Sequence, residues 1–297
     1  MRLLTSDEPH FGGTIVLKEY IGSQIPPYAI LSHRWTDDEI SYEDMSKGWS
    51  TLPAAGRDKI EKFCRLAGFN GYSHAWVDTC CIDKRSSAEL TESINSMYNW
   101  YGEAAICYAY LNDVPDNEEV VQDPVFARSV WFTRGWTLQE LIAPSRVIFF
   151  SNGWNEIGEK HTLARRLAQI TDIDVHVLGG AKHPYECSVA QRMAWAANRV
   201  TTRREDIAYS LLGLFDVNMP LLYGEGEKAF IRLQEEIVRI SDDDSLFAWK
   251  DETASPMDCH GLLANSPKHF RESRHIWCPA SRMDRQPYTI TNRGIRI

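Results

Sequence analysis

Apolar positions in the first part of the chain alternate between short continuous runs and helix-spaced stripes. Residues 28–32 form a run typical of a buried strand, and residues 60–67 then carry apolar side chains at i, i+3, i+4 and i+7. Residues 75–78 predict a second strand. Residues 86–101 predict a helix with one apolar stripe, and the capping-box pattern Ser-x-x-Glu stands at its start. These signals indicate two consecutive strand–helix units.

Two further runs, at residues 105–111 and 146–150, predict strands on either side of a short helix that contains Glu140. Near-continuous apolar strands that alternate with helices are typical of a parallel sheet covered on both faces. We therefore expect residues 1–153 to form an α/β core around a doubly wound parallel sheet.

The second part of the chain changes to a mostly helical pattern. Amphipathic stripes fall within residues 163–170, 207–214 and 230–240. Cap patterns that start helices stand at Ser188-x-x-Gln191 and Thr202-x-x-Glu205. After Pro256 the pattern becomes short and β-like.

This change of pattern divides the remainder of the chain into two parts. We expect residues 154–251 to form a helical extension packed on the core, because single amphipathic helices need a partner surface. The joining segment 151–157 is short and contains Trp and Ile, which suit packing better than a free tether does. Residues 252–297 are expected to form a β-rich tail that continues into a longer protein.

Charge and hydropathy exclude several classes of partner. The net charge of −9 disfavours a protein that binds duplex nucleic acid through Lys and Arg. The N-terminus has no apolar signal core, and no apolar stretch reaches membrane-spanning length. We expect a soluble cytoplasmic protein without nucleic-acid or membrane partners.

The cysteines predict reduced, buried thiols and no metal site. They are odd in number, form no Cys-x-x-Cys pair and have no His at ligand spacing. Cys80 and Cys81 follow a predicted strand, so one of these two thiols is a candidate to face a cleft. The seven are Cys64, Cys80, Cys81, Cys107, Cys187, Cys259 and Cys278.

Glu140 has two interpretations, and both stay open. In the first, Thr137 is the N-cap of the short helix and Glu140 closes a capping box with it. In the second, Glu140 is a catalytic carboxylate at the carboxyl edge of the sheet, where open α/β sheets bind ligands. Trp136 stands immediately before this helix.

Polar and aromatic residues also follow the first two predicted strands. After Ser32 and His33, Arg34 is suited to a phosphate and Trp35 to stacking on a base. The alternative for Arg34 is an ion pair with a nearby acidic side chain. Asp78 ends the second strand, and a carboxylate there needs a partner or caps the following loop. Ser32 and His33 are not a nucleophile–base pair, because neighbouring strand residues point to opposite faces.

These blocks together resemble a fungal heterokaryon-incompatibility (HET) domain. The first block is residues 28–35 (YAILSHRW), the second residues 76–83 (WVDTCCID), and the third residues 134–141 (RGWTLQEL). Residues 202–213 and 219–226 resemble an extension of HET proteins that carry nucleotide-binding and repeat domains further on. The chain departs from many members at His33-Arg34-Trp35.

The resemblance implies a distant relation to TIR domains and thus a flavodoxin-like core. Trp136 and Glu140 stand where TIR domains have a Trp and a glutamate that supports cleavage of NAD⁺. Such a carboxylate opposes the positive charge of an oxocarbenium-like ribose. By this resemblance Glu140 is catalytic, Trp35 and Trp136 hold the base, and Arg34 lies near the diphosphate, with Ser32, His33, Asp78 and Cys80 lining the same cleft.

The resemblance leads to two functional hypotheses. In the first, the protein is an NAD⁺ glycohydrolase that assembles on activation and acts in non-self recognition and programmed cell death, a form of innate immunity. NAD⁺ is then a substrate, and no cofactor is required. In the second, the domain is a non-enzymatic signalling module that recruits partners, and Glu140 is only a cap.

Overall fold

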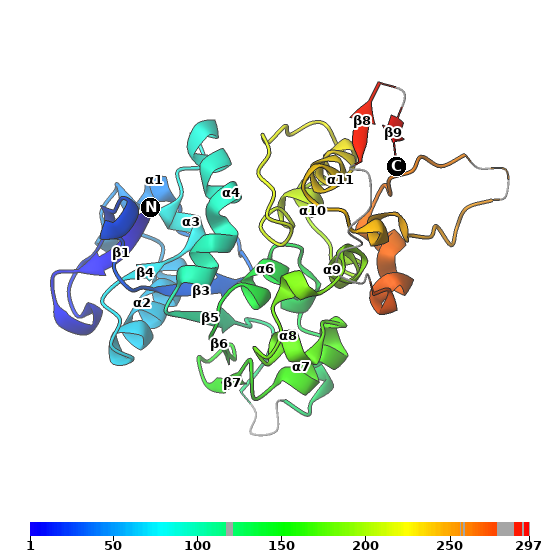
Figure 1. Ribbon diagram of the computed structural model, residues 1–297. Coiled ribbons are helices and arrows are strands. Elements are labelled where there is room, and N and C mark those ends of the chain that lie inside the picture. Colours follow the sequence, from blue (N-terminus) through cyan, green and yellow to red (C-terminus); the bar gives the residue numbers. More distant parts are fainter. Residues whose placement is uncertain (117–120, 256, 258, 278–287, 293, 297) are drawn as a thin grey trace. The chain divides into compact units, whose positions relative to one another are not determined.

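The computed structural model describes residues 1–116, 121–255, 257, 259–277, 288–292 and 294–296 (Figure 1). The chain divides into two compact units. The first comprises Met1–Trp131 and Glu140–Arg166, and the second comprises Phe132–Gln139 and Leu167–Ile297. Each unit is described by itself below.

The first unit contains a seven-stranded sheet in the order β2-β1-β4-β3-β5-β6-β7. The four central strands, β4, β3, β5 and β6, are parallel to one another, and β1, β2 and β7 are antiparallel at the edges. The strands are β1 (Arg2–Ser6), β2 (Ile15–Glu19), β3 (Ala29–His33), β4 (Ala75–Trp76), β5 (Ile106–Tyr110), β6 (Val147–Phe150) and β7 (Glu156–Glu159).

The order of the parallel strands indicates where a ligand would bind. Counted along the chain from β3, the order is 2-1-3-4, which is the doubly wound order of flavodoxin-like sheets. The strand order reverses between β3 and β5, and their carboxyl ends carry His33 and Tyr110 in register. Ligands of open α/β sheets bind in the crevice at such a reversal. The predicted α/β class and the parallel core strands are confirmed.

Helices cover both faces of this sheet. On one face, α2 (Ala54–Phe69) places Phe63 edge-on against Tyr108 of β5, with ring centroids 5.9 Å apart. On the other face, Trp131 packs edge-on against Phe149 of β6 at 5.6 Å. Buried apolar side chains therefore line both sides of the central strands, as their continuous apolar sequences predict.

The edges of the sheet were not predicted from the sequence. Strands β1 and β2 form a hairpin that adds to β4, so the sheet is mixed and not wholly parallel. Strand β7 adds to β6 beyond residue 153, where the sequence placed the end of the core. The first unit therefore extends to Arg166.

The helices of the first unit differ from the sequence prediction at two starts. Helix α4 has Ser86 as its N-cap, but the Glu89 carboxylate accepts hydrogen bonds from the Asp83 N–H and from Arg2 instead of closing a capping box. Asp78, predicted as the end of a strand, is the first residue of helix α3. Besides α2, the α-helices that lie wholly in this unit are α1 (Tyr42–Met45), α3 (Asp78–Cys81), α4 (Ser87–Glu103) and α5 (Pro124–Ala127).

The second unit is mostly helical, as predicted. The Ser188–Gln191 capping box is present at the start of α9, whereas the helix predicted after Thr202 begins only at Asp206. Glu205 instead accepts hydrogen bonds from the N–H groups of Gly224 and Gly226. Its α-helices after residue 166 are α7 (Ala164–Thr171, from Leu167 on), α8 (Val175–Leu178), α9 (Val189–Ala196), α10 (Asp206–Tyr209) and α11 (Lys228–Ile240).

The C-terminal part of the second unit contains a 3₁₀ helix, η7 (Pro267–His275), and the hairpin β8 (Thr289–Thr291) and β9 (Gly294–Arg296). The hairpin agrees with the β-like pattern predicted there. Cys278 lies outside the described residues. Of the other six cysteines all are free thiols, five are buried, and Cys259 is exposed.

Candidate functional site

Ser32 and Glu140 meet at the carboxyl end of β3. The Ser32 hydroxyl donates a hydrogen bond to the Glu140 carboxylate, and it accepts one from the Trp131 indole N–H at 2.9 Å. Glu140 is only 7% exposed. The carboxylate predicted as catalytic is therefore held inside the first unit by a chain of polar contacts.

Tyr101 and Cys107 complete the surroundings of this carboxylate. The Tyr101 phenol donates to the Leu31 carbonyl at 3.0 Å, and the Cys107 thiol lies 4.0 Å from the Glu140 carbonyl oxygen. Burial, followed by the charge of Glu140, raises the pKa of both side chains well above their ordinary values. Both groups are therefore neutral at physiological pH.

The start of α6 (Thr137–Ile142) does not agree with the capping-box interpretation. The helix begins at Thr137, which is thus the first helical residue and not the N-cap. The Thr137 hydroxyl donates to the Arg134 carbonyl at 3.0 Å and accepts from Arg199 at 2.9 Å. Glu140 instead bonds across the sheet edge to Ser32.

A second polar cluster lies on the opposite face of β3, because His33 points away from Ser32. The His33 Nε2 is 3.0 Å from the Asp78 carboxylate, and its Nδ1 is 2.9 Å from the Lys59 ammonium. Lys59 also forms an ion pair with Glu39. His33 therefore links the Lys59 ammonium on one ring nitrogen to the Asp78 carboxylate on the other.

Trp35 is held over this second cluster. Its indole N–H donates to Asp78 at 2.7 Å, and the Lys84 ammonium lies 3.6 Å from the centre of its ring. This is a cation–π contact at a side chain that is 45% exposed. Trp35 was predicted to stack on a base, but a lysine of the same chain covers one face of its ring.

Asp78 is the centre of the second cluster. Burial favours its neutral form, but the hydrogen bond and charge of His33, the charge of Lys84 and the Trp35 N–H outweigh this and lower its pKa. Cys80 does not accompany it into a cleft. Because α3 is helical, these two residues do not share a face, and the Cys80 thiol is fully buried with a pKa raised well above its ordinary value.

The two remaining predicted residues lie apart from these clusters. Arg34 is exposed, and no ion pair of its guanidinium is found in the described part of the chain. Trp136 belongs to the second unit. There burial raises the pKa of Asp206, and hydrogen bonds from Tyr223 and Trp136 oppose that increase.

The structure adds Lys160, which the sequence did not single out. Its ammonium is buried after β7 and donates to the carbonyls of Leu141, at 3.2 Å, and Pro144, at the end of α6. A cation there complements the helix dipole one turn after Glu140. Burial lowers the pKa of Lys160 to about 8. Only the three-dimensional pairing of β7 with β6 brings this lysine to the helix.

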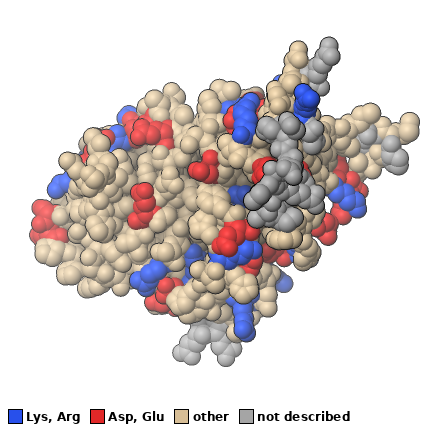
Figure 2. Space-filling view, in the orientation of Figure 1, with Lys and Arg blue, Asp and Glu red and all other residues tan. Residues whose placement is uncertain are grey.

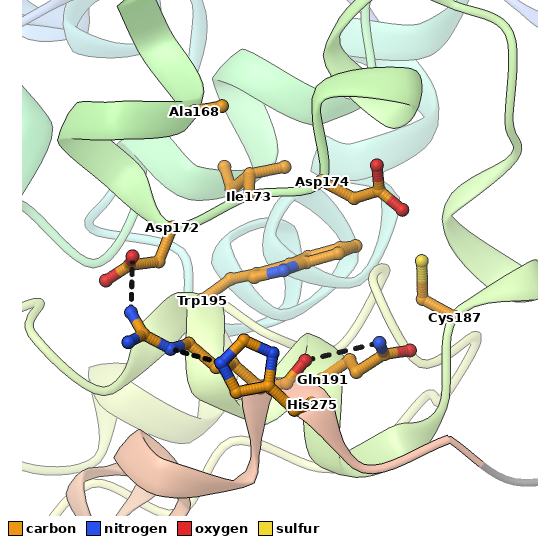
Figure 3. Close-up of a pocket in the computed structure, with 9 residues that line it drawn as sticks. Ala168, Asp172, Ile173, Asp174, Cys187, Gln191, Trp195 and His275 are labelled. Carbon is orange, nitrogen blue, oxygen red and sulfur yellow. Dashed lines mark hydrogen bonds and ion pairs between the residues drawn. The ribbon is translucent and has the colours of Figure 1, made fainter. Parts of the chain in front are cut away.

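The second unit contains a pocket of about 290 Å³ between α7, α9 and η7 (Figure 3). Asp172 forms an ion pair with Arg274 at 2.8 Å on one side, and the Trp195 indole crosses the centre. None of the lining residues was predicted from the sequence. They are Ala168, Asp172, Ile173, Asp174, Cys187, Gln191, Trp195, Arg274 and His275.

Three negative findings concern metal sites, membrane-spanning helices and surface charge. Within the described residues, no group of three or more His, Cys, Asp or Glu side chains is arranged to hold a metal ion. The helices described are all too short or too polar to cross a bilayer. On the face shown in Figure 2, acidic and basic side chains are interspersed and form no continuous basic patch.

The fold and these clusters define an α/β domain with a mostly parallel central sheet and a buried carboxylate at its strand-order reversal. Residues 28–128 match the family model of the heterokaryon incompatibility protein (HET), and residues 228–293 match a domain of unknown function (DUF8212). Over residues 28–128 the chain is thus similar to the HET family.

The match to one relative covers more of the chain. The vegetative incompatibility protein HET-E-1 of Podospora anserina is 48% identical over 245 residues, which are 80% of this chain and 18% of that protein. The chain therefore corresponds to less than a fifth of that relative. No solved structure matches the chain.

Proposed function

We propose that this chain acts in heterokaryon incompatibility, the fungal response to fusion with a non-self partner, and that it triggers cell death there. The matched HET model and the 48% identity to a vegetative incompatibility protein support this role. The chain is a small part of that relative's length, so further domains of a longer protein are expected to receive the signal that activates it.

We further propose that the domain cleaves NAD⁺ between nicotinamide and ribose, as the resemblance to TIR domains implies. The observation that carries this proposal is the Ser32–Glu140 hydrogen bond at the carboxyl end of β3. Departure of nicotinamide leaves positive charge on the ribose, and a fixed carboxylate stabilises that charge. Ser32 orients Glu140, and Trp131 orients Ser32.

Because Glu140 is buried, the proposed activity requires a conformational change. At 7% exposure the carboxylate does not reach a dinucleotide in solution, so the first unit must open before it can act. The Lys84 ammonium must also leave the face of the Trp35 ring that it covers before a base can stack on that face. We therefore propose that activity requires self-association or another activating event that exposes both clusters.

The same burial favours the alternative, a non-enzymatic signalling module. A carboxylate that is satisfied by Ser32 inside the domain also suits a purely structural role. In that case the exposed surfaces recruit partners, and Glu140 contributes only to stability.

One experiment separates these two functions. Purified protein is incubated with NAD⁺ over a range of protein concentrations, while light scattering reports assembly and chromatography reports free nicotinamide. The enzymatic proposal expects nicotinamide release that rises more steeply than protein concentration. Assembled protein that releases none supports the signalling module instead.

A further inference from the structure

The pocket of the second unit contains an indole N–H that has no protein acceptor within the described residues. Trp195 as a whole is 4% exposed, and its indole nitrogen is not among the fully buried polar atoms that lack a partner, so the N–H is open to the pocket. The side chain lines the pocket and crosses its centre (Figure 3). A polar group that lines a pocket pairs there with water or with a ligand. An acceptor atom of a ligand in the pocket would therefore meet this N–H.

One side of the pocket presents a donor and an acceptor next to each other. The Arg274 guanidinium forms an ion pair with Asp172 at 2.8 Å and donates to His275 at 3.1 Å, so its orientation is fixed. The side-chain amide of Gln191 donates a hydrogen bond to the Arg274 carbonyl at 3.2 Å, which fixes the backbone there as well. A ligand with a hydrogen-bond donor beside an acceptor is complementary to this edge.

Size, shape and charge narrow the class of ligand. A volume of about 290 Å³ suits a single small ring system and is at the lower end of ligand pockets. Ile173 is buried and, with Ala168, supplies apolar contact for the face of a ring. Asp172 is paired with Arg274 and Asp174 with Lys182, so the carboxylates and cations balance and leave no surplus positive charge to bind phosphate or another anionic group.

We propose that this pocket binds a neutral, planar heterocycle of nucleobase size. An acceptor atom of the ring receives the Trp195 N–H, and the donor–acceptor edge of the ring meets Asp172 and Arg274. The site lies wholly in the second unit and does not depend on Glu140 or on NAD⁺ cleavage. Residues 168–195 of the pocket lie outside both matched family models, and Arg274 and His275 lie within the second.

Adenine is the probe for this site, because it has ring acceptors beside an amino donor. Saturation-transfer NMR and calorimetric titration of the complete chain should detect adenine binding, and adenosine monophosphate should bind more weakly. Trp195→Phe keeps an aromatic side chain but removes the indole N–H, and it should raise the Kd about five- to tenfold, as expected for one lost hydrogen bond. Trp277→Phe, an exposed tryptophan outside the lining, is the matched control.

A second variant keeps the test valid if Trp195→Phe does not fold. Asp172 and Arg274 are about half exposed, so Arg274→Met removes the edge donor, while it keeps a long side chain, with little effect on folding. It should weaken adenine binding by a similar factor. The proposal is overturned if the wild-type chain shows no saturation transfer to adenine, or if both pocket variants bind adenine as tightly as the wild type does.

Discussion

The hydroxyl of Ser32 donates to the carboxylate of Glu140, which connects β3 to α6 across 108 residues of sequence. The contact depends on the register of β3, because a shift by one residue would direct His33 to Glu140 and Ser32 to the opposite cluster. Two neighbouring strand residues thus serve two separate polar clusters, one on each face of the sheet.

Replacement of Glu140 by Gln tests the role of the charge. The amide keeps the size of the side chain and can still accept the Ser32 hydrogen bond, so the melting temperature should change by only a few degrees. If the carboxylate stabilises a cationic transition state, nicotinamide release should fall by about a hundredfold or more.

Glu92→Gln is the control for this substitution. Glu92 is exposed on α4 in the same unit, and its replacement also removes one negative charge. Nicotinamide release and cell killing should stay at wild-type levels in Glu92→Gln. Full activity of Glu140→Gln would rule out a catalytic carboxylate at this position.

Ser32→Ala should destabilise the first unit by about 1–3 kcal/mol, because it removes a buried group that both donates and accepts. The free energy of unfolding, measured in urea, gives this value directly. A double-mutant cycle with Glu140→Gln should show a coupling energy of about 0.5 kcal/mol or more. Strictly additive effects would mean that the two side chains do not interact in solution.

The sequence predicted the four central strands and their helices, since each is a distinct apolar run or stripe. It missed β1 and β2, which are short edge strands whose pairing with β4 is not visible in local pattern. The site predicted from the sequence also combined Ser32 with Asp78. The alternation of side chains along β3 could be predicted, but the helical conformation of α3, which brings Asp78 to His33, is set by packing. Lys59, Lys84 and Lys160 were missed because surface and buried lysines look alike in a sequence.

Asp78→Asn should lower stability near neutral pH and have little effect in acid. The pKa of Asp78 is lowered in the folded protein, so the ionised group contributes stability above its unfolded pKa and loses it as the pH falls through the folded value. Unfolding of both proteins in urea, followed from neutral pH to below pH 3.8, should give curves that converge. A constant difference over the whole range would show that the charge of Asp78 is not involved.

Lys160→Met should alter stability in alkaline solution. The folded pKa of about 8 lies below the ordinary 10.5, so between these values the unfolded state binds more protons and wild-type stability rises with pH. The rise amounts to at most about 3 kcal/mol. Lys160→Met lacks this contribution, and its unfolding free energy should therefore fall behind the wild type as the pH increases through this window. Lys62→Met, which removes an exposed lysine, should follow the wild-type curve.

Truncation after Ser151 should cause aggregation. Such a fragment lacks β7, which pairs with β6, and it lacks Lys160, which holds the end of α6. Loss of β7 leaves the wholly apolar strand Val147–Phe150 as an open edge, and open apolar edges pair with other chains. A fragment that ends at Arg166 keeps both elements and should aggregate less, as light scattering would measure. A soluble fragment ending at Ser151 that unfolds cooperatively would contradict this argument, because it would show that the core does not need β7.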